Sequence, residues 1–237
     1  MSAQTRPLAV VACRVLQSML EQLLPPGLTD QVVFLDYGLH RVPGKMTLAV
    51  QEALDAIPQA SLVVLGYGLC GNGLHGVRAG QHTLLVPRTH DCIALLLGSQ
   101  QAYMSQFEAV PGTIYLSKGW LESGSHPLKE YQEYAAKYGP QEAEWLLDQQ
   151  YRNYQRLALV ASSQAELEHY RPQALEVARF CERWGYRYEE ILGSDDYVRR
   201  LIQLAGACAR GDSAGDGSPD FLVIPPGGQI DQAQFMR

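Results

Sequence analysis

The 237-residue sequence predicts an α/β protein with a doubly wound, mainly parallel sheet and helices on both of its faces. Two observations carry this prediction. Short aliphatic and β-branched runs recur along the chain, and Gly, Pro or polar residues bound each run, which is typical of buried strands. Longer segments with helical spacing of apolar residues lie between many of these runs. Because strands and helices alternate, the expected sheet is parallel.

The strand pattern occurs in eight segments. The third and fourth are the clearest, because each is an uninterrupted aliphatic run that ends in Gly or Pro. The predicted strands are residues 7–12, 31–35, 62–65, 83–86, 113–116, 156–161, 186–192 and 221–224.

Helices are predicted between the strands, and several have clear start or stop signals. Pro25-Pro26-Gly27 ends the first helix, Pro43-Gly44 begins the second, and Ser162-Ser163 caps the longest. The predicted helices are residues 15–24, 43–57, 93–106, 162–184 and 195–207, and residues 127–154 form two helices joined by a turn at Gly139-Pro140.

The length is sufficient for one large core, so we expect a single α/β domain over residues 1–237 with a helical excursion at about residues 121–155. The alternative is a division into two α/β halves, residues 1–120 and 156–237, with the helical hairpin inserted between them.

Composition excludes several classes of partner. The net charge is −6 and no run of Lys or Arg occurs, which argues against binding to nucleic acid or to an anionic membrane. No apolar stretch approaches the length of a membrane span, and the apolar run near the N-terminus is too short for a signal peptide. We therefore expect a cytoplasmic protein. Its five scattered cysteines indicate free thiols or metal ligands rather than a disulfide framework.

Three cysteines fall just after predicted strands, and the carboxyl ends of parallel strands share the edge of the sheet where ligands bind. Cys13, Cys70 and Cys92 have this position, and His90 lies next to the third of them. We predict that these four residues form a metal site, with His40 as a further candidate because it follows the second strand. Thiolate and imidazole are ligands that zinc prefers, so we expect zinc. An iron–sulfur cluster on the three cysteines is the alternative.

The surroundings of Cys92 lead to two finer expectations. A thiol near the N-terminus of a helix has a depressed pKa, so Cys92 is expected to be partly thiolate. Asp91 either orients His90 or caps the helix that begins at Cys92. Cys181 and Cys208 lie on apolar helix faces instead and are expected to serve packing.

The glycine-rich loop after the third strand supports a different interpretation of the site. Gly66-Tyr67-Gly68-Leu69-Cys70-Gly71 has the spacing of the dinucleotide-binding fingerprint, but the segment that follows is too short and too rich in glycine for the required helix. We expect Gly68, Gly71 and Gly73 to let the backbone approach a ligand closely. The alternative function is therefore a metal-free α/β binding module that holds a small phosphate-bearing ligand on this loop.

The sequence resembles domain-of-unknown-function family 1638, a prokaryotic family, from about the first strand to Trp120. The residues that carry the resemblance are Asp36-Tyr37-Gly38-Leu39-His40 with Pro43, Tyr67-Gly68-Leu69-Cys70-Gly71-Asn72-Gly73, Pro87-Arg88, His90-Asp91-Cys92-Ile93, Leu97-Gly98-Ser99, Pro111-Gly112-Thr113 and Gly119-Trp120.

The resemblance implies no settled activity. Some family members occur beside genes of corrinoid-dependent methyl transfer, so it implies a site for thiol, methyl-group or corrinoid-linked chemistry, with a small molecule or a corrinoid or methyltransferase protein as partner. Zinc-dependent methyltransferases of that chemistry use a His-x-Cys pair and a distant Cys. His90 and Cys92 have that local form, although the other cysteines here precede the pair. Whether the protein is an enzyme or an accessory protein stays open.

Overall fold

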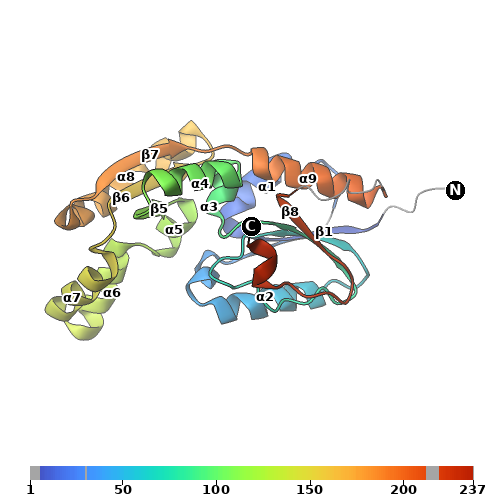
Figure 1. The fold of residues 1–237 in the computed structure, drawn as a ribbon, viewed down its shortest axis with the longest axis horizontal. Helices are drawn as coiled ribbons and strands as arrows, with labels where there is room; N and C mark the ends of the chain where they lie inside the picture. The colour runs from blue at the N-terminus through green and yellow to red at the C-terminus, as the bar shows by residue number, and fades with distance from the viewer. Residues whose placement is uncertain (1–5, 30, 212–218, 237) are drawn as a thin grey trace. The chain divides into compact units, whose positions relative to one another are not determined.

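The computed structural model describes residues 6–29, 31–211 and 219–236 (Figure 1). The chain divides into two compact units. The first unit contains residues 1–100 and 195–237, and the second contains residues 101–194. The second unit is thus inserted into the first along the chain, a division that differs from the halves 1–120 and 156–237 considered from the sequence.

The first unit contains a five-stranded sheet with the order β2-β1-β3-β4-β8. The first four strands are parallel, and β8 pairs with β4 in the antiparallel direction. Residues on both faces of β3 are buried, as expected for a strand covered on both sides. The strands are β1 (Leu8–Cys13), β2 (Gln31–Leu35), β3 (Leu62–Gly66), β4 (Thr83–Pro87) and β8 (Phe221–Ile224).

Helices cover both faces of this sheet, which confirms the doubly wound α/β class (Figure 1). Helix α2 (Pro43–Asp55) packs on one face, where Met46, Val50 and Leu54 enter the core. Helix α9 (Asp196–Ala209) packs on the other face and contacts α1 (Gln17–Leu23) and α3 (Ile93–Leu97). Short 3₁₀ turns complete the unit: η1 (Arg14–Leu16), η2 (Tyr37–Arg41) and η4 (Gln232–Phe235).

The helix predicted over residues 93–106 is two helices. Helix α3 ends at Gly98, whose φ of 88° is left-handed, and α4 (Gln100–Ala109) begins two residues later. A glycine in this conformation ends a helix because it turns the chain away from the helix axis. The break coincides with the boundary between the two units.

The second unit contains a parallel three-stranded sheet with the order β5-β6-β7. Its strands are β5 (Thr113–Leu116), β6 (Arg156–Ala161) and β7 (Arg187–Leu192). Helix α8 (Gln164–Cys181) packs on β6 and β7, and the Ser163 side chain caps it by accepting a hydrogen bond from the Glu166 amide, as predicted. Helix α5 (Lys118–Ser123) and the turn η3 (Glu182–Trp184) complete the unit.

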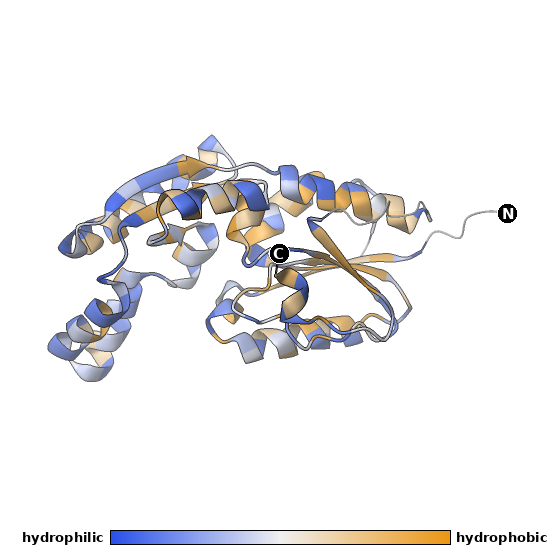
Figure 2. Cartoon of the chain, viewed as in Figure 1, coloured by the Kyte–Doolittle hydropathy of each residue, from blue (hydrophilic) through white to orange (hydrophobic). Residues whose placement is uncertain are grey.

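The predicted helical hairpin is confirmed. Helices α6 (Pro127–Tyr138) and α7 (Pro140–Tyr151) pack against each other and are joined at Gly139. Figure 2 shows that the residues of these two helices are mostly hydrophilic, whereas hydrophobic residues concentrate on the strands of the first unit. In the described part of the chain, no helix combines the length and the apolar character needed to cross a membrane.

The order of strands in the first unit creates a switch point. The chain passes from β1 to β2 on one side and then returns to place β3 on the other side of β1. In doubly wound sheets, ligands bind outside the carboxyl ends of the strands where the winding direction reverses. Here that point lies between the carboxyl ends of β1 and β3.

Candidate functional site

Three cysteines occupy the carboxyl edge of the first unit's sheet. Cys13 is the last residue of β1 and is partly buried. Cys70 lies in the loop after β3, and Cys92 immediately precedes α3 after β4; both are buried. Cys13 and Cys70 therefore flank the switch point. All five cysteines of the chain are free thiols.

Backbone hydrogen bonds join the loops after β3 and β4. The Leu69 amide donates to the Thr89 carbonyl over 2.9 Å, and the Cys70 amide donates to the His90 carbonyl over 2.8 Å. Gly68 fits against the second loop so closely that a Cβ at this position would lie 2.7 Å from the Asp91 carbonyl carbon. These contacts fix Cys70 and Cys92 relative to each other.

The backbone at Cys70 adopts an unfavourable conformation. Cys70, Gly71 and Asn72 have φ values of 48°, 62° and 71°, so three consecutive residues are left-handed. Glycine adopts this region freely and asparagine tolerates it, but a cysteine there costs roughly 1–2 kcal/mol. Such strain persists where the surrounding structure enforces it, and it is frequent at functional sites.

The three thiols share one electrostatic environment. A hydrogen bond with the Cys70 thiol raises the pKa of Cys92 well above its usual value, and burial and charge on Cys70 and Cys13 raise it further. Burial raises the pKa of Cys13 to about 12, a shift that a hydrogen bond from the Val15 backbone partly opposes. The expectation that Cys92 has a depressed pKa is therefore wrong. The five-residue helix after it has too few peptide dipoles to outweigh burial beside a second thiol.

Tyr67 is the residue of this site that the sequence analysis missed. Its side chain is 2% exposed, and its hydroxyl has no hydrogen-bond partner among the residues that the structure describes. Burial raises the pKa of this hydroxyl, and charge on Cys13, Cys70 and Cys92 would raise it further. Tyr67 follows Gly66, which pairs with Ala12, so it lies beside Cys13 and packs in the same cluster as Cys70. The only sequence signal is its position, three residues before Cys70.

The predicted histidines lie in different surroundings. His90 is exposed, and the part of it that contacts the site is its backbone carbonyl. His40 is half-buried, and its Nδ1 lies 2.6 Å from the Tyr37 carbonyl oxygen. Burial lowers the pKa of His40. Asp91 accepts a hydrogen bond from the Ile93 amide over 2.9 Å, which matches the capping role considered for it.

The glycines of the loop mostly serve contacts within the chain. Gly68 is packed against Asp91, and a Cβ at Gly73 would lie 2.6 Å from the Met46 sulfur. Gly71 has more space, with the Pro43 ring 3.8 Å from such a Cβ. The amides of Leu69, Cys70, Gly73 and Leu74 donate to backbone carbonyls. This use of the amides favours the thiol site over an anion cradle.

Within the described ranges, no group of three or more His, Cys, Asp or Glu side chains has the arrangement of a formed metal site. Metal binding by Cys13, Cys70, Cys92 and His90 stays a prediction.

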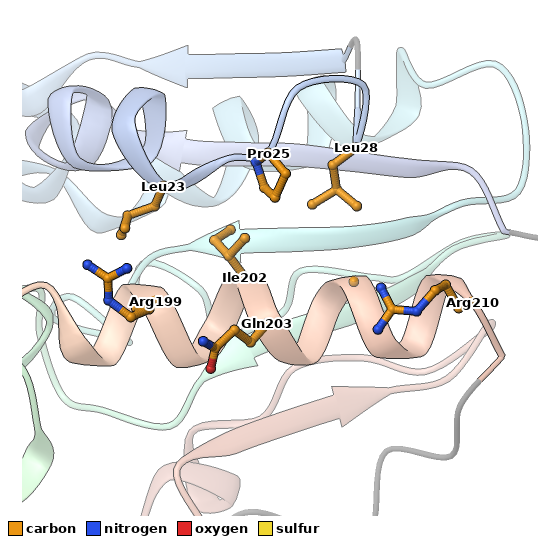
Figure 3. A pocket seen from close by; sticks show the side chains of 8 residues that line it. Leu23, Pro25, Leu28, Arg199, Ile202, Gln203 and Arg210 are labelled. Atoms are coloured by element: carbon orange, nitrogen blue, oxygen red, sulfur yellow. The ribbon is translucent and has the colours of Figure 1, made fainter.

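The first unit also has an open pocket of about 400 Å³ between the segment after α1 and helix α9 (Figure 3). Leu23 and Pro25 precede β2, so this pocket lies toward the amino ends of the strands, away from the cysteines. Arg199 at its rim forms an ion pair with Asp195. The lining residues are Leu23, Pro25, Leu28, Arg199, Ile202, Gln203, Gly206 and Arg210.

Comparisons with known proteins place the chain in a family. No curated protein and no solved structure matches it. A family described as "Protein of unknown function (DUF1638)" matches residues 34–202, which run from β2 into α9. The match includes Tyr67, Cys70, Cys92 and the whole second unit, whereas Cys13 precedes it. Because the match covers well over half of the sequence, the chain belongs to the DUF1638 family of proteins of unknown function.

Proposed function

We propose that this protein binds one zinc ion through the thiolates of Cys13, Cys70 and Cys92, and that the fourth zinc position accepts the thiol of a small molecule. The observation that carries this proposal is that three cysteines lie at or just past the carboxyl ends of three neighbouring strands, β1, β3 and β4, beside the switch point of a doubly wound sheet.

Packing alone accounts poorly for these cysteines. A buried cysteine in a core acts as a small apolar residue and needs no special backbone. Cys181 fits that description, because it is fully buried on α8 in the core of the second unit. Cys70 instead occupies a left-handed position where glycine would be less costly, which favours a role for its side chain over simple packing.

Thiolate ligands suit zinc, which binds them at about 2.3 Å, and they also suit an iron–sulfur cluster. We propose zinc and keep the cluster as the alternative that metal analysis distinguishes. His90 is exposed and is left out of the proposed ligand set, which changes the set predicted from the sequence.

Three protein ligands from separate loops are typical of a zinc site that keeps an open position, whereas structural sites are closed by four. A thiol that binds there loses its proton and becomes a nucleophilic thiolate. Transfer of a methyl group to that sulfur is one reaction open to it. A methyl-corrinoid on a partner protein could donate the methyl group and keep the bond's electron pair on cobalt. The proposal also implies a reducing compartment such as the cytoplasm.

Metal analysis of the purified protein tests the proposal. Protein prepared without oxygen should contain one zinc ion per chain, and Cys70→Ser and Cys92→Ser should each abolish zinc binding while the fold persists. Cys208→Ser is the matched control in the same unit, because Cys208 lies near the end of α9, which contacts the amino end of β1 and not the carboxyl ends of the strands, and it should keep its zinc. Full zinc in either site variant would refute the assignment. If the protein is brown and its broad visible absorption bleaches in air, the site holds an iron–sulfur cluster and not zinc.

A further inference from the structure

We propose that the hydroxyl of Tyr67 donates a hydrogen bond to the atom that occupies the fourth zinc position, and thereby selects ligands that bind through an anionic sulfur or oxygen. This inference rests on the proposed zinc site and names the group that recognises its substrate.

The position of Tyr67 is the first argument. It follows β3 directly, three residues before Cys70, and it packs in the same hydrophobic cluster as Cys70 and Cys13. Gly66 of β3 pairs with Ala12 of β1, so the next residues of the two strands, Tyr67 and Cys13, lie beside each other. The buried phenol therefore lies in the part of the core that Cys13 and Cys70 border.

The unused hydrogen-bonding capacity of Tyr67 is the second argument. Its hydroxyl is buried, and no described group of the protein pairs with it. Buried polar groups in folded proteins are almost always paired, and an exception calls for a ligand, an ion or a catalytic use. The neighbouring thiols do not fill this role either, since they are among the described groups that do not pair with it.

The protonation state of Tyr67 determines which ligands it favours. A tyrosine hydroxyl is protonated at neutral pH and can act as a donor. A zinc-bound thiolate sulfur or hydroxide oxygen keeps lone pairs that can accept this hydrogen bond. The coordinating nitrogen of imidazole has no second lone pair. Tyr67 should therefore strengthen the binding of a thiol but not the binding of imidazole.

The full-length protein with Co²⁺ in place of Zn²⁺ makes ligand binding visible in its absorption spectrum. Titration with 2-mercaptoethanol and, separately, with imidazole gives an affinity for each ligand in the wild-type protein and in Tyr67→Phe. We expect the variant to bind the thiol at least about tenfold more weakly, the lower range for a hydrogen bond to a charged group. Its affinity for imidazole should change by less than about twofold.

A general disturbance of the site would weaken both ligands equally, so the ratio of the two affinities isolates the hydrogen bond. Tyr197→Phe is the control, because Tyr197 is buried in the same unit and its hydroxyl donates to the Asp220 carbonyl. The control should leave both affinities unchanged. Unchanged or equally weakened binding of both ligands in a fully metallated Tyr67→Phe would overturn the inference and leave the zinc site intact. Absence of metal from the wild type would instead overturn the proposed function.

Discussion

At the scale of single residues, the hydroxyl of Tyr67 is buried, and no described protein group forms a hydrogen bond with it. Leaving such a group unpaired costs about 1–3 kcal/mol, whereas an apolar replacement of the same shape removes that cost. We therefore expect Tyr67→Phe to raise the free energy of unfolding of the metal-free protein by about 1 kcal/mol. Urea denaturation of the metal-free protein, followed by circular dichroism, measures the change.

The matched variant Tyr197→Phe should have the opposite effect. The Tyr197 hydroxyl and the Arg88 amide each donate to the Asp220 carbonyl over 2.7 Å, so the substitution removes one of these two hydrogen bonds and should cost about 1 kcal/mol. Equal destabilisation by both substitutions would mean that the Tyr67 hydroxyl is satisfied within the folded chain.

The buried thiol of Cys181 should make the stability of the protein depend on pH. Burial raises the pKa of its thiol from 9.0 to about 12. Because the folded state keeps the proton and the unfolded state releases it, the stability contributed by Cys181 is complete below the unfolded pKa and is lost as pH rises from about 9 to about 12. The maximum slope is about 1.4 kcal/mol per pH unit.

The comparison of wild type with Cys181→Ala isolates this group from the other ionisable residues. In the presence of reductant, the wild type should be more stable at pH 8, and its advantage should shrink by about 1 kcal/mol or more at pH 10. Urea denaturation at the two pH values measures this advantage. An advantage that stays constant between them would show that the thiol ionises equally in both states.

At the scale of elements, the contact between the loops after β3 and β4 depends on Gly68. A Cβ at this position would lie within 2.8 Å of three backbone atoms of Asp91, and backbone cannot move aside as a flexible side chain does. We expect Gly68→Ala to cost about 1–3 kcal/mol and to separate Cys70 from Cys92, so that zinc content falls.

Gly44→Ala is the control for that substitution. Gly44 lies in the first turn of α2, and a Cβ added there would have no atom within 4 Å, so alanine should be neutral or slightly stabilising. Thermal unfolding and zinc analysis of both variants test the prediction. Full zinc content and unchanged stability in Gly68→Ala would show that the two loops separate without cost.

The bounds of a strand or helix can be predicted well where they depend on neighbouring residues in the sequence. The predicted bounds of β2, β5, β6 and β8 agree with the structure, because each is a short apolar run between turn residues. The prediction of one continuous helix over residues 93–106 was wrong. The apolar residues after Cys92 indicated a buried helix, and the break at Gly98 was not recognised. The positions of Cys13, Cys70 and Cys92 at or just past strand ends followed from the strand pattern alone, and their assembly into one metal site stays a prediction. The orphan hydroxyl of Tyr67 could not be predicted, because a missing partner is a property of the tertiary structure.

At the scale of the whole molecule, the second unit has a sheet and a core of its own. Leu157, Leu159 and Val177 are fully or almost fully buried there, and its segment is continuous in the sequence. We expect residues 101–194, produced alone, to fold cooperatively and to bind no zinc, since Cys181 is the sole thiol in that segment. Circular dichroism during thermal unfolding, together with metal analysis, tests both parts. A fragment without a cooperative transition would show that the second unit depends on the first.

The three cysteines come from distant parts of the chain, so a zinc ion bound to them would also act as a cross-link. It would close one loop of about 57 residues between Cys13 and Cys70, and a shorter one between Cys70 and Cys92. Restricting an unfolded chain by a loop of the longer size corresponds to about 4 kcal/mol in the chain-entropy treatment of disulfides. Zinc would thereby tie β1, β3 and β4 together, and its removal would lower the resistance of the whole parallel sheet to unfolding.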